Sequence, residues 1–419
     1  MRILTALILT LFTFALHAND VYTVIANPGE NASKSIRINW HSDLDDKPVF
    51  CFYTECGDTN WSKAKKAIAK QELCTAFDSI YSKTPTNENF YETARFNRNT
   101  VEISALKPNT KYMYRIGTNA NNGEIRYFKT APENGIWTAA IISDFHAYTP
   151  LPQRVTSAMN MIKTLEKCNN ADFDMVLNMG DIIAWGGSYS FWRDLYTNEP
   201  FKKYIWAGVN GNHDNMDRTY KKSSNKFFHY ANNNPENGYE GETGVCYYFT
   251  YGETLFIALN NESMRKDEGL KVAQDWVKDV IKSNPSKFIV VMEHYEWFHG
   301  TDGRNSQYTR WKELFDEYGV DLAIAGNNHV YARTNALYND KETNGNKGTV
   351  YVQTPSSDNE RGQNLKEWVY NKDLIKYRWC EGHKTVGGLT LKCTGDKLHL
   401  KLYDRNGNLI DTVTVLSKR

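Results

Sequence analysis

Five short clusters of carboxylate, imidazole and amide side chains are the part of this sequence that could carry chemistry. In chain order they are Asp144-Phe145-His146, Gly180-Asp181, Gly211-Asn212-His213-Asp214, Glu293-His294 and Gly326-Asn327-Asn328-His329. These side chains are the ligands that hard and borderline divalent cations prefer. A single Asp-x-His pair is usually an ordinary surface pair, but five such clusters in order, each after an apolar stretch, predict a metal centre.

The segments before these clusters read as buried strands. WTAAIISDF, starting at Trp137, is almost continuously apolar and ends in polar residues, and the segments before the other four clusters repeat the scheme. Helical patterns lie between them, at 151–168, 270–283 and 309–319. Strands that alternate with helices predict a layered α/β fold, in which functional sites collect at the carboxyl ends of the strands. The closing segment returns to strand alternation.

The first part of the chain has a different pattern. SIRINWHS, at 35–42, alternates apolar and polar residues, and TVEISAL, KYMYRIGTN and EIRYFKT do the same. Several short alternating strands predict a β-sandwich of the immunoglobulin or fibronectin type. The segment 60–74, NWSKAKKAIAKQELC, is more helical in composition and is expected to be an insertion or irregular excursion. We therefore expect a sandwich over 19–131, a linker at APENG, and a second domain over 136–419.

The N-terminal segment MRILTALILTLFTFALHAND has the features of a secretory signal peptide. Arg2 provides the positive charge, an apolar stretch follows, and Ala18 provides the small residue before the expected cleavage at Asn19. The apolar stretch is shorter than the roughly 20 residues that a membrane span requires. The sequence thus predicts a signal peptide over 1–18 and a secreted or periplasmic protein without a membrane anchor.

The charge balance bears on binding of nucleic acids, and the cysteine content bears on disulfide bonds. Lys and Arg number 50 against 49 Asp and Glu, so nothing indicates binding of a nucleic acid polymer. In an oxidising compartment some of the seven cysteines should pair. Cys380 and Cys393 are the first expected pair because they flank one expected hairpin, and Cys51, Cys56 and Cys74 could supply another bridge.

The order DxH, GD, GNHD, H and GxxH resembles that of the calcineurin-like metallophosphoesterase superfamily. Within it, the chain is similar to the purple acid phosphatases over nearly its whole mature length. ALKPNTKYMYRIG and RYFKTAP look like the closing strands of that family's fibronectin type III-like front domain, and DRNGNLIDTVTV like its C-terminal strands. The resemblance implies a four-layer α/β/β/α metallophosphoesterase domain behind the sandwich.

The resemblance also implies roles for individual residues. Asp144, His146 and His329 would hold a first metal ion, and Asp181 would bridge to a second. Asn212, His294 and Asn327 would complete the second site. His213 would contact the substrate phosphate or protonate the leaving oxygen, and His299 would face the substrate. Tyr331 and Arg333 would support the ligands from behind.

Two positions depart from the purple acid phosphatase pattern. Ala184 stands where that family has the tyrosine whose phenolate colours an iron(III) site, so a violet enzyme is not expected. Asn327 stands where the family has a histidine. An amide oxygen is a weaker ligand than imidazole for zinc-like ions, so the second site should be weaker or prefer harder cations, unless Asn327 points away and one firm metal remains.

The expected function is hydrolysis of small phosphate monoesters by a hydroxide that two divalent ions activate, with Fe, Mn and Zn the favoured metals. G-x-S-x-G and P-loop patterns are absent from the sequence. One alternative is a phosphodiesterase or nucleotidase, with specificity set by loops at 185–192, 297–305 and 353–363. Another is a phosphatase-like binding protein with weak or lost catalysis.

Overall fold

The computed structural model describes residues 21–45, 49–79, 91–217, 224–239, 243–298, 307–345, 347–358, 360–362 and 372–419. The predicted signal peptide and His299 lie outside these residues. The first part of the chain forms two four-stranded sheets, in the orders β1-β2-β6-β5 and β4-β3-β7-β8. Their strands are β1 (Tyr22–Pro28), β2 (Ile36–Ser42), β3 (Phe50–Glu55), β4 (Lys65–Ala67), β5 (Lys70–Ser79), β6 (Tyr91–Ile103), β7 (Lys111–Gly117) and β8 (Arg126–Lys129).

The alternation seen in the sequence builds the core of this sandwich. Ile36, Ile38 and Trp40 of β2 are almost completely buried, and they share one apolar cluster with Tyr114 and Phe128 of the other sheet. Successive side chains of a strand point to opposite faces, so every second residue of β2 enters the space between the sheets. The predicted β-rich front domain is confirmed.

The expectation that segment 60–74, with its more helical composition, is an insertion or irregular excursion is wrong. This segment contains β4 and the first half of β5, and β5 pairs with β6 from Lys70 opposite Thr100 to Ser79 opposite Tyr91. Lysine and alanine favour helices only by tenths of a kcal/mol per residue. A ladder of backbone hydrogen bonds to a long neighbouring strand outweighs that preference.

Two larger sheets form the second part of the chain, in the orders β11-β10-β9-β21-β22-β23 and β12-β13-β14-β15-β19-β16-β20. Strands β9, β10 and β11 are parallel, as are β13, β14, β15 and β19. A small two-stranded sheet joins β17 to β18. The bounds are β9 (Ile136–Ile142), β10 (Met175–Asn178), β11 (Ile205–Gly208), β12 (Tyr247–Tyr251), β13 (Thr254–Ala258), β14 (Phe288–Met292), β15 (Leu322–Ala325), β16 (Tyr331–Arg333), β17 (Leu337–Tyr338), β18 (Lys341–Glu342), β19 (Val350–Gln353), β20 (Tyr377–Trp379), β21 (Gly387–Thr394), β22 (Lys397–Asp404) and β23 (Leu409–Leu416).

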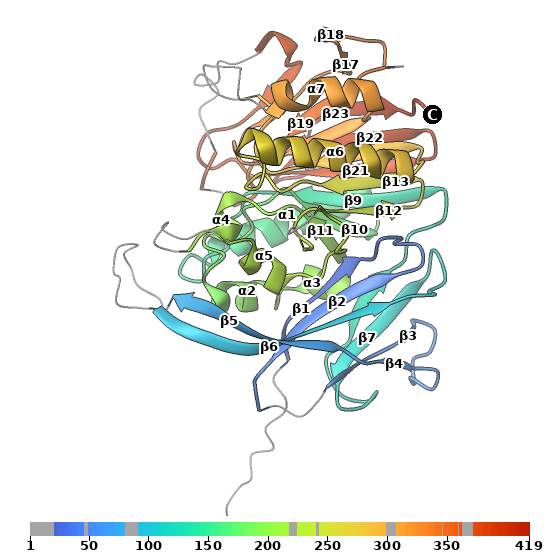
Figure 1. Cartoon of the computed structure of the whole chain (residues 1–419), viewed down its shortest axis with the longest axis vertical. Helices are drawn as coiled ribbons and strands as arrows, with labels where there is room; N and C mark the ends of the chain where they lie inside the picture. The colour runs from blue at the N-terminus through green and yellow to red at the C-terminus, as the bar shows by residue number, and fades with distance from the viewer. Residues whose placement is uncertain are drawn as a thin grey trace, which may run out of the picture.

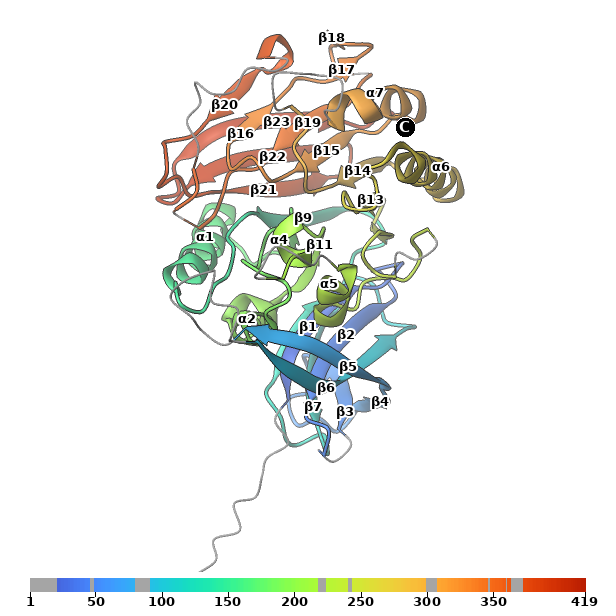
Figure 2. The same ribbon diagram turned by 60° about the vertical axis from the view of Figure 1, so that its left-hand side comes forward.

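Helices cover the outer faces of the two sheets. Figure 2 shows α1 on one side of the strands and α6 and α7 on the other, while Figure 1 looks onto α6 and α7. The predicted four-layer arrangement is therefore confirmed. The helices are α1 (Gln153–Asn169), α2 (Tyr189–Leu195), α3 (Glu199–Lys203), α4 (Asn212–Asn215), α5 (Asn225–Ala231), α6 (Asp267–Ser283) and α7 (Gln307–Tyr318), with a 3-10 turn at Lys372–Leu374.

The continuous apolar strands of the sequence are buried on both faces, as their composition predicts. Ile141 of β9 belongs to the core between the two sheets, together with Met292 of β14. Its neighbour Ile142 packs in the outer layer with Ile162 and Leu165 of α1. Burying both faces holds each strand firmly, which fixes the position of the polar residues at its carboxyl end.

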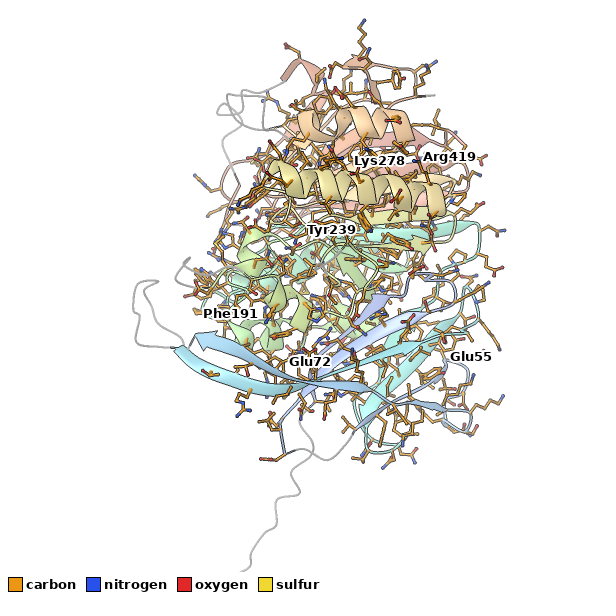
Figure 3. The ribbon with its side chains drawn as sticks, viewed as in Figure 1. Glu55, Glu72, Phe191, Tyr239, Lys278 and Arg419 are labelled. Atoms are coloured by element: carbon orange, nitrogen blue, oxygen red, sulfur yellow. The ribbon has the colours of Figure 1, made fainter. Side chains whose placement is uncertain are left out.

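The sandwich lies against the side of the second domain that carries α2, α3 and β11. Asn27 of β1 donates a hydrogen bond to the carbonyl oxygen of Trp206 in β11 at 2.8 Å. Arg419, labelled in Figure 3, lies in the part of the molecule away from the sandwich. Its guanidinium donates a hydrogen bond to the buried carboxylate of Asp321 at 2.9 Å. None of the helices in the described residues is long and apolar enough to cross a membrane.

The predicted Cys380–Cys393 disulfide is wrong. The two residues do not flank one hairpin, because Cys380 follows β20 of the seven-stranded sheet and Cys393 lies in β21 of the six-stranded sheet. The Cys380 sulfur lies 3.2 Å from the hydroxyl oxygen of Thr385, and Cys393 is buried opposite Leu398. All seven cysteines are present as thiols.

Candidate metal centre

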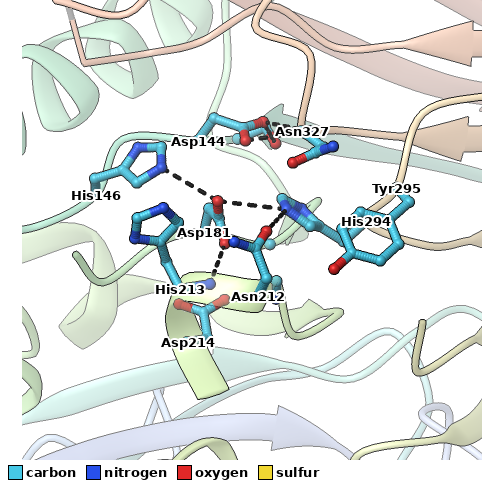
Figure 4. Close-up of polar contacts among 12 residues, drawn as sticks. Asp144, His146, Asp181, Asn212, His213, Asp214, His294, Tyr295 and Asn327 are labelled. Atoms are coloured by element: carbon cyan, nitrogen blue, oxygen red, sulfur yellow. Dashed lines mark hydrogen bonds and ion pairs between the residues drawn. The ribbon is translucent and has the colours of Figure 1, made fainter. Parts of the chain in front are cut away.

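The five clusters found in the sequence meet where the carboxyl ends of five parallel strands approach one another. Asp144 and His146 follow β9, Asp181 follows β10, and Asn212 and His213 follow β11. From the second sheet, His294 follows β14, and Asn327 and His329 follow β15. Figure 4 shows seven of these eight side chains, labelled, converging on one space, and His329 joins them through Asp144. The side chains come from both sheets, so they meet only because the two sheets pack against each other.

Two glycines of the clusters allow the backbones to come this close. Gly180 has φ +89°, and a Cβ there would lie 2.5 Å from Nδ1 of His294. A Cβ on Gly211 would lie 2.1 Å from Oδ1 of Asp181. Any larger residue at either position would push a candidate ligand out of place.

Five of the converging residues have left-handed backbone conformations. The φ angles are +52° at Asp144, +43° at His146, +51° at Asp181, +67° at Asn327 and +57° at His329. Such a conformation costs an L-residue on the order of 1 kcal/mol or more and persists only where the surrounding structure enforces it. The fold therefore holds these side chains in place against a local cost.

Three imidazoles are oriented by backbone carbonyls. Nδ1–H of His294 donates to the oxygen of Met179 at 2.7 Å, and that of His329 donates to the oxygen of Arg361 at 2.8 Å. His213 does the same toward Ala184 at 2.7 Å. In each ring the hydrogen bond of Nδ1 leaves Nε2 as the nitrogen that faces the ligand space, which is how proteins orient a histidine to bind a metal.

The bridging position predicted for Asp181 has a suitable geometry. Its Oδ2 lies 3.2 Å from Nε2 of His146 and 3.4 Å from Nε2 of His294, and these rings come from different sheets. Nε2 of His294 also lies 3.3 Å from Oδ1 of Asn212. On the other side, Nε2 of His329 lies 3.4 Å from Oδ1 of Asp144.

The donor chemistry fits divalent cations. Ligand atoms of Asp144, His146 and His329 lie within 4.8 Å of one another, and so do those of Asp144, Asp181 and His294. Burial raises the pKa of Asp181, but the charge of His294 and hydrogen bonds from His146 and His294 outweigh burial, so the pKa lies well below its usual value. The attraction of Asp181 likewise raises the pKa of His294 to about 10 against the effect of burial. In the ion-free protein a protonated imidazole thus supplies the positive charge that a cation would bring.

The Asp214 carboxylate stabilises the turn that carries Asn212 and His213. Its two oxygens accept hydrogen bonds from the backbone N–H groups of Gly211 at 2.8 Å and Ile183 at 3.0 Å. Burial and the nearby charge of Asp181 raise the pKa of Asp214 to about 7. Asp214 therefore shapes the loop and does not face the ligand space.

Several residues around the centre were not predicted from the sequence. Ser143 donates a short hydrogen bond to Asp144, and Asn261 accepts from the backbone N–H of His294 at 2.7 Å. Asp358 lies 3.7 Å from Nδ1 of His146, and Arg361 lies beside Asp358 at 3.5 Å. Asp358 and Arg361 belong to the 353–363 loop, which was predicted only as a specificity loop. No spacing rule links such residues to ligands that are distant in sequence.

Two of the sequence predictions fall away from the centre. Tyr331 and Arg333 were expected to support the ligands, but both contact Asp411 of β23, at 2.9 Å and 2.7 Å. The loops at 185–192 and 297–305 were expected to set specificity, but their aromatic residues Tyr189, Trp192 and Trp297 are buried in the cores.

Comparison with known proteins agrees with this fold. Residues 138–331 match the calcineurin-like phosphoesterase family, and residues 21–130 match the purple acid phosphatase N-terminal domain. The chain therefore carries a calcineurin-like phosphoesterase domain behind a purple acid phosphatase N-terminal domain, and the resemblance seen in the sequence is confirmed.

Individual relatives are distant. The chain is 25% identical over 294 residues to probable purple acid phosphatase 20 of Arabidopsis thaliana, covering 67% of this chain and 65% of that protein. It is 26% identical over 303 residues to purple acid phosphatase 21 of the same plant, covering 69% and 64%. The matches thus span slightly less than two thirds of these relatives. Purple acid phosphatase PPD1 isolated from yellow lupin (Lupinus luteus) seeds has a similar fold, with a TM-score of 0.71, 18% identity, and coverage of 95% of this chain and 74% of that one.

Proposed function

We propose that the protein is an exported, metal-dependent phosphatase that hydrolyses small phosphate monoesters. Two divalent ions would be held by Asp144, His146, Asp181, Asn212, His294, Asn327 and His329. The observation that carries this proposal is the position of Asp181, whose Oδ2 faces imidazoles from two different sheets at 3.2 and 3.4 Å. The signal-peptide pattern of residues 1–18 supports export.

Bound ions would neutralise the phosphate oxygens, align the ester and lower the pKa of water. The chain supplies a proton-carrying side chain nearby in His213. Its Nδ1–H donates to the carbonyl oxygen of Ala184. Nε2 is therefore the ring nitrogen that would exchange a proton with the substrate. Burial lowers the pKa of His213 to about 4 in the ion-free protein. An anionic phosphate beside Nε2 raises that pKa, and the resulting imidazolium can protonate the leaving oxygen.

Arg361 is the second group that we assign to the substrate phosphate. Its side chain is 28% exposed, and its Nε lies 3.5 Å from Asp358. Within the described part of the chain the two Nη atoms make no hydrogen bond, although the guanidinium is close enough to influence the pKa of His213. A partly buried guanidinium with available N–H groups beside a phosphoesterase centre suits the oxygens of a phosphate.

The metals in this proposal are divalent ions without a phenolate ligand. Ala184 occupies the position of the purple acid phosphatase tyrosine, and its carbonyl oxygen instead orients His213. A phenolate-to-iron(III) charge-transfer band is therefore not expected after loading with iron. Which of Fe, Mn and Zn restores hydrolysis in the metal-stripped protein decides the identity of the ions.

The direct test is hydrolysis of a chromogenic phosphate monoester by metal-stripped protein that has been refilled with Mn, Zn, Fe, Mg or Ca. We expect no turnover without metal and restored turnover with at least one of the first three ions. A matched diester substrate separates the monoesterase from the phosphodiesterase or nucleotidase alternative. Faster turnover of the diester would replace monoesters as the substrate class, and no turnover with any ion would refute the enzyme.

A phosphatase-like binding protein remains the second candidate, and Asn327 favours it because an amide replaces an imidazole ligand. Metal analysis of purified protein separates the two. Close to two bound ions per chain together with metal-stimulated hydrolysis supports the phosphatase. Bound metal close to zero and absence of hydrolysis support the binding protein.

A further inference from the structure

Asn327 is held by hydrogen bonds at both its backbone and its side chain. Its backbone N–H donates to the two carboxylate oxygens of Asp144 at 3.1 Å each. Its side-chain Nδ2 donates a short hydrogen bond to the carboxylate of Glu296, which follows His294 by two residues. The residue that replaces the expected histidine is therefore fixed in place.

The Glu296 carboxylate also decides which way the Asn327 amide faces. An amide has one side that donates and one that accepts, and either could face a neighbour by rotation. A carboxylate oxygen can only accept, so it binds the NH₂ side and turns Oδ1 the opposite way. Figure 4 shows the amide oxygen of Asn327 on the side that faces Asp144 and His294, and the nitrogen on the far side. Oδ1 is consequently presented to the ligand space.

This orientation gives the second half of the centre an oxygen-rich set of ligands. It contains amide oxygens from Asn212 and Asn327, a carboxylate oxygen from Asp181, and one imidazole from His294. The first half has two imidazoles, His146 and His329. Amide and carboxylate oxygens suit Mn²⁺, Mg²⁺ and Ca²⁺, whereas imidazole suits Zn²⁺.

We propose that Glu296 is the positioning residue that makes Asn327 a metal ligand, and that the second site thereby discriminates less strongly for Zn²⁺ against Mn²⁺ than the first site does. The proposal rests on the two-ion centre of the proposed function. Glu296 acts through Asn327 and does not itself touch the ion. Mutation of a residue that holds a metal ligand in this way typically lowers the metal affinity 10- to 100-fold.

The test is calorimetric titration of the metal-stripped full chain with Mn²⁺ and, separately, Zn²⁺, with Mn²⁺ occupancy followed by electron paramagnetic resonance. Glu296→Ala should weaken the second Mn²⁺ by about 10- to 100-fold and leave the first within about twofold. Glu296→Gln should lose less, because the oxygen of its amide can still accept from Asn327. The unchanged first site shows that each variant is folded.

A neighbouring carboxylate provides the matched control. Glu262 accepts a hydrogen bond from the Tyr295 hydroxyl at 2.6 Å and one from Arg265 at 2.8 Å. In the part of the chain that the structure describes, Glu262 bonds to no candidate ligand, so Glu262→Ala should leave both affinities unchanged. An equal loss in Glu262→Ala would mean that general negative charge near the site matters, and it would overturn the role of Glu296.

A rescue experiment separates positioning from general damage. Asn327→His in the Glu296→Ala background supplies an imidazole and should restore the second ion, with the affinity ratio of Zn²⁺ to Mn²⁺ at that site raised at least about tenfold. An unchanged second-site affinity in Glu296→Ala would overturn this inference while leaving the two-ion phosphatase intact. Fewer than two ions in the unmodified protein would refute the proposed centre itself and this inference with it.

Discussion

Buried polar side chains gather in two regions of this molecule, the metal centre and the interface between the sandwich and the second domain. At the interface the polar side chains bond mainly to other groups of the protein, although a few buried atoms, such as Nε of Arg98, have no hydrogen-bond partner among the described residues. Asn233 accepts from Arg37 at 3.2 Å and donates to the carbonyl oxygens of Ile38 and Val101 at 3.1 Å each. Arg98 donates to the carbonyl of Asn232 at 2.6 Å.

In the metal centre the polar groups instead face one another. Asp144 and Asp181 are both buried carboxylates, and the Nε2 atoms of the imidazoles turn toward the same space. Buried like charges are costly without a nearby positive charge, whereas buried polar groups that are hydrogen-bonded to the protein are not. The contrast teaches that burial of polar groups is not by itself a sign of function. What distinguishes a binding site is that its groups need a partner from outside.

The largest expected effect is on the bridging position. Asp181→Asn removes the charge that both ions would share, so we expect monoester hydrolysis to fall by about a thousandfold or more, which is about 4 kcal/mol. Asp214→Asn should cost less, because Asp214 contacts backbone N–H groups of the loop. Turnover numbers at saturating metal check this pair. Equal losses would mean that Asp181 does no more than shape the loop.

At the interface, Asn233→Ala should cost stability and not activity. The substitution removes the amide that donates to two buried strand carbonyls and accepts from Arg37, so we expect the free energy of unfolding to fall by about 2–4 kcal/mol. Denaturant unfolding measures the loss, and metal content per folded chain should stay the same. A variant that unfolds normally but loses its metal would break the distinction between the two regions.

Added metal should stabilise the protein through the centre alone. At a metal concentration of about 100 times Kd, one bound ion contributes about 2.7 kcal/mol to the folded state. Thermal unfolding with and without Mn²⁺ should show the same rise in Tm for the unmodified chain and for Asn233→Ala. Asp181→Asn should show little or none. A rise that depends on Asn233 would place metal binding at the interface.

Substrate binding should depend on Arg361 without any change in the ions. Loss of charge-assisted hydrogen bonds to phosphate costs about 1.5–3 kcal/mol, so Arg361→Ala should raise KM, and the inhibition constant of inorganic phosphate, by about 10- to 100-fold. Arg361→Lys should recover part of this loss. Because the backbone oxygen of Arg361 accepts from His329, bound metal is measured in parallel. An unchanged KM would remove Arg361 from the phosphate site.

The smallest expected effect is a pH dependence at the interface. His41 donates to the carbonyl of Tyr230 at 2.7 Å, and its other ring nitrogen accepts from Tyr189 at 3.0 Å. Burial and, to a lesser extent, the charge of Arg98 lower its pKa from 6.5 to about 3. The unfolded chain therefore takes up this proton first, so stability is fully present above pH 6.5 and is lost as the pH falls from 6.5 toward 3.

Proton uptake by His41 in the unfolded chain should lower the free energy of unfolding by about 1 kcal/mol as the pH falls from 7 to 5.5. Denaturant unfolding at several pH values measures the slope, and His41→Gln, which cannot titrate, should flatten it. The same slope in both proteins would assign the pH dependence to other groups. Stability should be compared in metal-free buffer, so that ion binding at the centre does not enter the measurement.

Much of this molecule could be predicted from local patterns. The apolar strands before Asp144, Asp181 and His294 are continuous, and a strand that is buried on both faces leaves little choice of fold class. The segment 60–74 was assigned wrongly, because its lysines and alanines are compatible with a helix until β6 offers a long edge to pair with. The Cys380–Cys393 pairing failed for a similar reason, since strands that are close in sequence joined different sheets.

The sequence by itself determined which residue types could bind cations and in which order they follow their strands, because side-chain chemistry and strand periodicity are local properties. Only the tertiary structure decided that Glu296 meets Asn327, that Arg361 and Asp358 stand beside the histidines, and that Tyr331 and Arg333 turn to Asp411. Those contacts join segments that are distant in the sequence, and they are set by strand pairing within a sheet for Glu296 and Asn327 and by the packing of the two sheets for Tyr331 and Arg333 with Asp411.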